Sequence, residues 1–123
     1  MAREGKTTER WPVATRSEIG PGEHKIVSVK RHSVGVYNVN GEYHAVLNVC
    51  PHELAPVCRG PVGGTTLPSQ PGSFEWGREG EILSCPWHGW EFDLLTGASV
   101  ADPKVRVRRY EVEIEDDTIY VVL

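Results

Sequence analysis

The chain has 123 residues, of which 39% are hydrophobic, and its formal net charge at neutral pH is −4. This length suffices for one domain with a sizeable core but leaves little for a separate catalytic domain. The mild acidity argues against nucleic acid as a partner, and residues 1–10 contain no apolar stretch typical of a signal peptide or a membrane span. We therefore expect a soluble, cytoplasmic protein with no membrane partner.

The first half of the chain alternates hydrophobic and polar residues with a period of two, which is typical of β-strands. Residues 17–22 allow at most a short turn. Residues 34–38 and 43–47 then alternate on either side of Asn40-Gly41, a dipeptide that favours a two-residue hairpin turn. The sequence therefore predicts an antiparallel hairpin here.

The same period continues towards the carboxyl end. Residues 73–76 and 81–84 flank the glycine-containing stretch 77–80 and predict a second hairpin, and residues 105–114 and 119–123 alternate around Asp116-Asp117. No window supports a long helix. The sequence thus predicts an all-β fold, an antiparallel sandwich or barrel of short strands.

Two short motifs each place a cysteine before a proline and close on a histidine: Cys50-Pro51-His52 and Cys85-Pro86-Trp87-His88. Thiolate and imidazole ligands together favour zinc or iron–sulfur. An iron–sulfur site of this composition has two histidines in place of two cysteines on one iron. A structural zinc site shares the ligand set, but zinc-finger spacings generally pair Cys with Cys and His with His, so the cluster is favoured.

The prolines and the following Gly89 suit loops of this kind. A residue before a proline is pushed towards extended geometry, so Cys50 and Cys85 are each held extended before the chain turns. Proline then fixes its own φ, so the histidine returns to the same side. Gly89 permits a close backbone approach, which lets amides point at sulfide.

These motifs resemble the fingerprint of the Rieske family, C-x-H followed later by C-x-x-H. The second motif continues through residues 89–97, Gly-Trp-Glu-Phe-Asp-Leu-Leu-Thr-Gly, which is similar to the cluster loop of Rieske-type ferredoxins and of ring-oxygenase Rieske domains. The resemblance implies a [2Fe-2S] cluster with Cys50 and Cys85 on one iron and His52 and His88 on the other.

The resemblance also implies an organisation and a function. Residues 1–123 would be a single Rieske domain, with a small cluster-binding subdomain of about residues 46–97 inserted in a β base of residues 1–45 and 98–123. The protein would carry single electrons from a reductase to a terminal enzyme such as an oxygenase, without being an enzyme itself. The alternatives are a redox-sensing or accessory iron–sulfur subunit and, less favoured, a zinc-stabilised binding module.

One segment departs from the family pattern. Thirty-two residues (53–84) separate His52 from Cys85, and the excess falls in residues 59–72, which are rich in Gly and Pro. This insertion either shapes partner access or is a solvated surface loop; the second is slightly favoured because surface insertions cost little loop entropy.

The remaining candidate residues have structural interpretations. High-potential Rieske proteins place half of an extra disulfide where Trp87 stands, so Cys58 is expected to be a buried, small apolar side chain. They also carry hydroxyl donors at the places of Trp90 and Phe92, aromatic residues expected to pack around His88. The other histidines are expected to be surface or packing residues: His24, His32 and His44.

Overall fold

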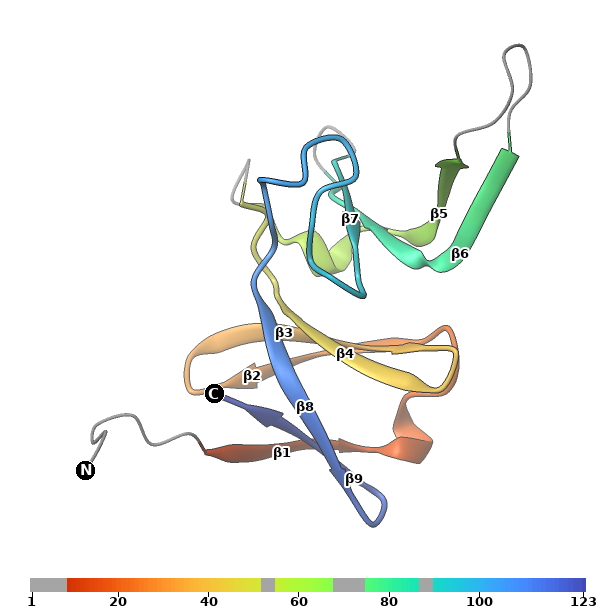
Figure 1. The fold of residues 1–123 in the computed structure, drawn as a ribbon. Helices are drawn as coiled ribbons and strands as arrows, with labels where there is room; N and C mark the ends of the chain where they lie inside the picture. The colour runs from red at the N-terminus through yellow and green to blue at the C-terminus, as the bar shows by residue number, and fades with distance from the viewer. Residues whose placement is uncertain (1–8, 52–54, 68–74, 87–89) are drawn as a thin grey trace.

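The computed structural model describes residues 9–51, 55–67, 75–86 and 90–123, and these residues are mainly antiparallel strands (Figure 1). The strands are β1 (Arg10–Thr15), β2 (His24–Val29), β3 (His32–Val39), β4 (Glu42–Leu47), β5 (Val62–Leu67), β6 (Glu75–Ser84), β7 (Glu91–Asp93), β8 (Arg109–Glu115) and β9 (Thr118–Val122). Two single-turn 3-10 helices, η1 (Arg16–Glu18) and η2 (Val57–Arg59), complete the described elements. The all-β prediction is confirmed, and η1 overlaps the start of residues 17–22, the stretch predicted to hold at most a short turn.

The larger of two sheets forms the base of the molecule. Its strand order is β1-β9-β8-β4-β3-β2, and β1 comes back beside β2, so the sheet is nearly a closed barrel (Figure 1). The alternate residues that point inwards are fully buried, among them Val34, Val36, Ile119 and Val121. Closing a sheet in this way leaves few exposed strand edges.

The hairpin predicted at Asn40-Gly41 is confirmed, and the two alternating segments around Asp116-Asp117 also pair as a hairpin. β3 pairs with β4 from Val34↔Leu47 to Val39↔Glu42, and the turn between them places Asn40 and Gly41 at φ 53° and 94°. Two successive residues with positive φ are what a type I′ turn requires. The β8–β9 hairpin turns at residues 116–117, also with a positive φ at its first position. The sequence predicts strand-like alternation from residue 105, but strand β8 begins only at Arg109.

The smaller sheet, β5-β6-β7, is formed by residues between β4 and β8 and lies at one end of the base (Figure 1). Here the predicted hairpin around residues 77–80 is wrong, because those residues lie inside the single strand β6. β5 pairs with both halves of β6, at Thr65↔Gly77 and at Gly63↔Ile82, so the residues between them bulge out of register. The partner strand β5 comes from the segment 59–72, which is therefore not purely a surface loop; residues 68–74 lie outside the described part of the chain.

A shared apolar core joins the two sheets. Tyr37 and Val46 of the base contribute to the same buried cluster as Leu83 of β6 and Phe92 of β7. Within the described ranges, no helix is long and apolar enough to span a membrane.

Candidate metal centre

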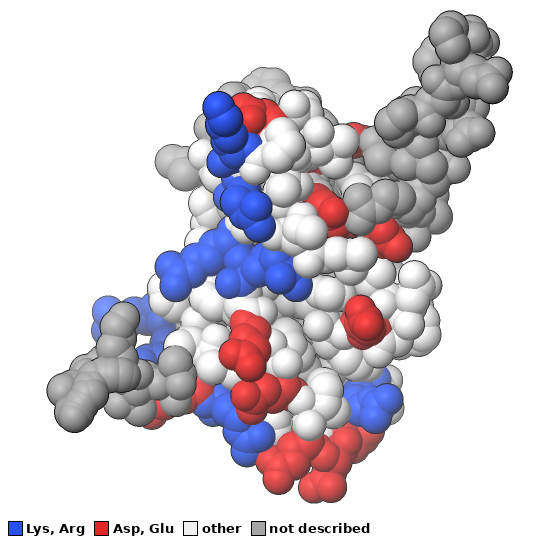
Figure 2. Space-filling model, viewed as in Figure 1, with Lys and Arg blue, Asp and Glu red and all other residues white. Residues whose placement is uncertain are grey.

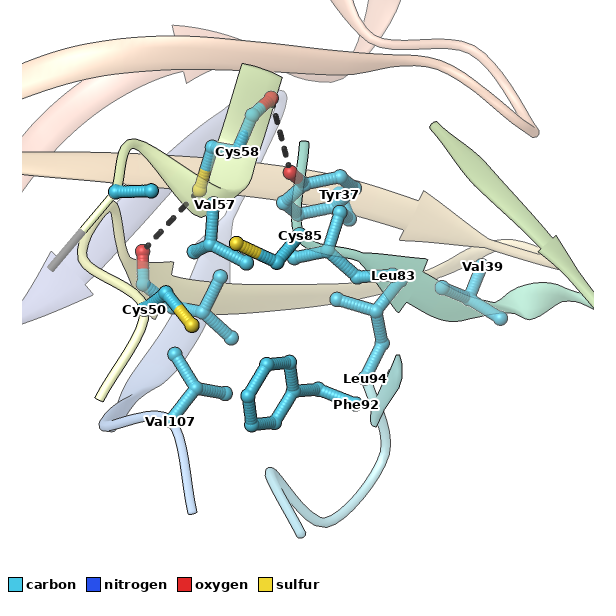
Figure 3. Packing of buried hydrophobic residues seen from close by; sticks show 12 residues of the cluster. Tyr37, Val39, Cys50, Val57, Cys58, Leu83, Cys85, Phe92, Leu94 and Val107 are labelled. Carbon is cyan, nitrogen blue, oxygen red and sulfur yellow. Dashed lines mark hydrogen bonds between the residues drawn. The ribbon is translucent and has the colours of Figure 1, made fainter. Parts of the chain in front are cut away.

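Cys50 and Cys85 lie in one buried cluster although 34 intervening residues separate them in the sequence. Cys50 follows β4 and is fully buried, and Cys85 follows β6 with 2% of its surface exposed. Figure 3 shows both sulfur atoms in this cluster, with Phe92 and Val107 nearby. The fold therefore brings the two predicted thiol ligands together at the junction of the sheets.

Each cysteine begins a loop closed by the same hydrogen bond. The N–H of Cys50 donates to the carbonyl of Ala55 at 2.8 Å, and the N–H of Cys85 donates to the carbonyl of Trp90 at 2.7 Å. In both loops the acceptor is the fifth residue after the cysteine. This repeated closure fixes where each loop begins and ends, so both cysteines have defined backbone positions.

Residues 55–61, which include η2, lie between the two ligand loops in the sequence and contact the chain beside both; they are called the strut here. On the side of the first loop, Asn48 holds the strut with its side chain. Asn48 Oδ1 accepts the N–H of Cys58 at 2.7 Å, and its Nδ2 donates to Ser33 Oγ on β3 at 3.1 Å. Asn48 therefore joins the strut to the base two residues before the first thiol.

On the side of the second loop, the strut contacts the chain through backbone. Ser84 N–H donates to the Pro61 carbonyl at 2.9 Å. Gly60 lies against the Ser84 carbonyl, and a Cβ at position 60 would overlap that oxygen and stand 3.1 Å from Pro86 Cδ. Only a residue without a side chain permits this approach.

Asn48 and Gly60 are positioning residues that the sequence interpretation missed. The only local signal for Asn48 is its place near the first motif, and Gly60 is one of several glycines in a segment whose composition favours a loop. Their contacts join positions 10 and 24 residues apart, which no local pattern indicates.

Cys58 is confirmed as a buried, small side chain. It is fully buried, its Sγ lies 4.0 Å from the Val46 carbonyl, and a Cβ on Gly35 would overlap that sulfur. Burial raises the pKa of the Cys58 thiol to about 11, although hydrogen bonds from Tyr37 and Gly35 act in the opposite direction. The thiol is therefore protonated at neutral pH. Its side chain packs η2 against Gly35 of β3.

The two predicted histidine ligands, His52 and His88, lie outside the described residues. Trp87, next to His88, also lies outside them. Of the aromatic residues expected around His88, Phe92 is fully buried in the thiol-containing cluster and Trp90 packs against it while partly buried. Both therefore pack with the cluster that contains the two thiols, while their predicted packing around His88 lies outside the described residues.

The described residues fit a thiolate-bound cluster. Cys50 and Cys85 present two soft donors in an apolar setting, where a thiolate requires a positive partner to offset its desolvation. Iron would supply that positive charge, and the hydrogen bonds of the Cys50 and Cys85 N–H groups hold the backbone of both donors in place. The geometry thus suits a group held by both loops at once.

The other three histidines take packing or surface positions, as predicted. His24 stacks on Tyr37 with ring centroids 4.8 Å apart, and exposed His32 is tilted against Tyr110 at 6.5 Å. His44 Nδ1 accepts a 2.9 Å hydrogen bond from Arg109 Nη2. Burial, followed by the neighbouring Arg109 charge, lowers the pKa of His44.

Comparison with known proteins agrees with this geometry. Residues 9–111 match the family model described as the Rieske [2Fe-2S] domain. The chain is 30% identical to the ferredoxin component of a naphthalene 1,2-dioxygenase system from Pseudomonas aeruginosa, over 94% of this chain and 98% of that protein. Among solved structures, the ferredoxin of carbazole 1,9a-dioxygenase from Nocardioides aromaticivorans IC177 matches with a TM-score of 0.70 and 28% identity, covering 91% of this chain and 95% of the other. A ferredoxin from Sphingomonas yanoikuyae B1 has the same TM-score at 27% identity, covering 94% and 99%.

Proposed function

Because this chain belongs to the Rieske [2Fe-2S] domain family, we propose that it shuttles single electrons from a reductase to a terminal oxygenase. The observation that carries the proposal is the burial of Cys50 and Cys85 in one cluster, each at the start of a loop closed by the same hydrogen bond. When bound, a [2Fe-2S] cluster supplies reversible one-electron oxidation and reduction. The chain acts as a component of such a system rather than as an enzyme.

The ligand assignment follows the two motifs. Cys50 and Cys85 hold one iron, and His52 and His88, which lie outside the described residues, hold the other. This set leaves the site less negative than four thiolates, because the imidazoles are neutral, and so makes it easier to reduce. Cys58 is not a ligand, since its thiol packs against Val46 and Gly35 on the base.

The surrounding residues serve electron transfer by holding the site still. The strut hydrogen-bonds to Asn48 and Ser84, which precede the two ligand loops, and Phe92 and Val107 pack beside the buried thiols. A site that changes little between oxidation states loses little energy to rearrangement when an electron enters or leaves. No substrate chemistry is needed from the chain itself.

The partners follow from the relatives. The similar protein from Pseudomonas aeruginosa is a ferredoxin component of a dioxygenase system, so this chain takes electrons from a reductase and gives them to an oxygenase or similar enzyme. It works in the cytoplasm and needs neither nucleic acid nor membrane. Residues 46–97 are its cluster-binding subdomain, within a single domain of residues 1–123.

Metal analysis tests this function directly. Anaerobically purified protein should contain two irons and two acid-labile sulfides per chain, and its reduced form should give an electron paramagnetic resonance signal with the low average g of mixed nitrogen and sulfur ligation. Zinc in place of iron, without labile sulfide, would contradict the proposal.

Single substitutions test the ligands. Each of four changes should abolish or cripple cluster assembly: Cys50→Ala, His52→Ala, Cys85→Ala and His88→Ala. The matched control is Cys58→Ser, which alters the third buried thiol and should keep both the cluster and its spectrum. Loss of the cluster in this control, with the fold intact, would show that the thiols are misassigned.

A further inference from the structure

Four of the 13 cationic side chains of this acidic protein lie within residues 104–109. They form what is called here the basic band, and all four are exposed: Lys104, Arg106, Arg108 and Arg109. Val105 and Val107, which alternate with the first three, pack with the cluster that contains both thiols. The band therefore lies on the outer side of the chain whose inner side covers the candidate metal centre.

No carboxylate of the described residues forms an ion pair with the band. Neutral groups orient it instead. Arg106 Nη2 donates to the Thr96 carbonyl at 2.7 Å, Arg108 stands 5.2 Å from the centroid of the Tyr110 ring, and Arg109 bonds to His44. The positive charges are thus held in place while remaining available to a partner.

An exposed apolar side chain lies beside the band. Val100 is 41% exposed and belongs to the loop 99–105, which the Ser99 N–H closes on the Val105 carbonyl at 2.8 Å. Val100 N–H donates to the Glu91 carbonyl at 2.9 Å, one residue after Trp90, which closes the second ligand loop. Val100 is therefore tied by short backbone links to the chain around Cys85.

The charges of the molecule are separated along β8. Figure 2 shows a run of Lys and Arg along one side of the upper half of this face, with a few Asp and Glu beside it, whereas Asp and Glu outnumber Lys and Arg towards the lower end. The exposed acids at that end include Glu111, Glu115 and the Asp116-Asp117 turn of the β8–β9 hairpin. Figure 1 places this turn opposite the loop 99–105. The end of β8 away from the candidate metal centre is thus rich in acids, whereas the basic band covers the end that carries the centre.

We propose that Val100 and the basic band form the docking face for an electron-transfer protein whose own contact surface is acidic. This inference rests on the proposed electron-carrier function and adds the chemistry of the partner. A cationic rim around an apolar contact attracts and orients an acidic protein, and it releases that protein readily because rim charges act mainly on the rate of association. Such transient interfaces bury less than about 1,200 Å².

The remaining charges near the face favour a protein over a polyanion. Asp102 lies on the same loop as Val100 and is exposed, and its carboxylate accepts the N–H of Lys104 at 3.2 Å. With a net charge of −4, the whole chain repels nucleic acid and anionic lipid at long range. A basic band with an acid beside it instead suits a protein partner, whose surface can place a positive charge opposite Asp102 and negative charges opposite the band.

Stopped-flow electron transfer to a protein probe tests the docking face. Cluster-loaded protein, reduced with dithionite and freed of excess reductant, is mixed with ferric cytochrome b5, an acidic haem protein. One electron leaves the carrier and reduces one ferric haem. The second-order rate constant should fall at least about tenfold as ionic strength rises from about 0.01 M to about 1 M. A rate constant independent of salt would overturn the proposal.

Two charge-reversal variants locate the effect. Arg106→Glu/Arg108→Glu should lower the rate constant at low ionic strength by about tenfold or more. The matched control Arg16→Glu/Lys25→Glu makes the same change in net charge at the other end of the molecule, near the β8–β9 turn, where the Arg16 N–H donates to the Asp117 carbonyl. Its rate constant should stay within about threefold of the wild-type value. Equal effects of the two variants would overturn the proposal. Because Arg106 also holds Thr96, single Arg108→Glu provides a variant that keeps that bond and should still lose about threefold.

Two further measurements distinguish the docking face from the carrier function and from a membrane site. Ferricyanide should reoxidise one electron per chain in every variant; no reaction in the wild type would refute the electron-carrier function, whereas reaction without a variant-specific effect on cytochrome b5 would refute the docking face alone. In a nuclear magnetic resonance titration with ferric cytochrome b5, the Val100 amide and the Arg106 and Arg108 side chains should shift. Binding to phosphatidylserine vesicles that Arg106→Glu/Arg108→Glu abolishes would instead place a membrane on this face.

Discussion

Gly60 lies so close to the carbonyl oxygen of Ser84 that a side chain at position 60 would overlap it. Ser84 directly precedes Cys85, and the Ser84 N–H donates to the carbonyl of Pro61, the residue that follows Gly60. The strut and the second ligand loop therefore meet backbone to backbone. Any atom added at Gly60 must separate them.

Gly60→Ala should therefore lower the free energy of unfolding by about 1–3 kcal/mol, the usual cost of overpacking a buried site. It should also hasten loss of the visible absorbance of the cluster, since Cys85 moves with Ser84. Urea unfolding and the decay of that absorbance measure the two effects. The matched control is Gly20→Ala, whose Cβ would meet only the flexible Glu23 carboxylate at 3.1 Å; it should change stability by less than about 0.5 kcal/mol. Equal effects would contradict the packing argument.

Asn48→Ala should cost about 1–3 kcal/mol of stability, because the Cys58 N–H loses its acceptor. The substitution frees the strut beside the first ligand loop, so the line shape of the electron paramagnetic resonance signal should broaden as Cys50 samples more positions. Chemical denaturation and the spectrum of the reduced protein check both expectations.

Asn38→Ala is the control for that spectrum. Asn38 also makes two side-chain hydrogen bonds, donating to the Ile19 carbonyl and accepting from the Gly41 N–H, but it does so in the base. It should destabilise the protein similarly and leave the spectrum unchanged. A spectral change in the Asn38 variant would mean that general loosening of the fold, and not the strut, disturbs the centre.

The buried Cys58 thiol should make stability fall in alkaline solution. Its pKa is raised by burial to about 11 in the folded protein, against an ordinary value of 9.0. Between these values the unfolded chain has lost the proton and the folded chain keeps it, so the free energy of unfolding decreases as pH rises. A pKa difference of this size corresponds to about 2–3 kcal/mol, present in full below about pH 9 and lost by about pH 11.

The Cys58→Ala variant isolates this contribution, because it removes the titrating group and little volume. Its free energy of unfolding should be flatter than that of the wild type between about pH 9 and 11 when both are measured by urea unfolding. Parallel curves would show that the thiol does not titrate differently in the two states.

The reduction potential should lie near the lower end of the Rieske range, around −150 mV. Phe92 is fully buried in the thiol cluster and has no donor, where high-potential members of the family place a hydroxyl, and Trp90 replaces a second one. Hydrogen bonds to cluster sulfur favour the more negative reduced form. Losing two donors of about 1 kcal/mol each lowers a one-electron potential by about 90 mV.

Protein-film voltammetry across pH checks this value. A low potential also implies that the histidine ligands lose their outer protons only in alkaline solution, so the potential should be nearly constant around neutral pH. A potential above zero, or a steep slope at neutral pH, would show that another donor acts in place of the missing hydroxyls.

Local sequence determined the features that depend on a few adjacent residues. Asn40-Gly41 predicted its hairpin because a type I′ turn needs two residues that tolerate positive φ. The two Cys-Pro motifs likewise predicted the thiols that the fold buries together, because each motif contains its own turn and its own ligand. Alternation of polar and apolar residues was enough to predict an all-β fold.

Only the tertiary structure decided the features that depend on a distant partner. Residues 77–80 have turn composition, yet they lie within β6 because β5 pairs with the chain on both sides of them. Asn48 and Gly60 act through Cys58 and Ser84, and the basic band became a defined face only when Val105 and Val107 packed beside the thiols. In each case the decisive energy comes from a contact between segments far apart in the chain, and a local pattern contains no information about which segments will meet.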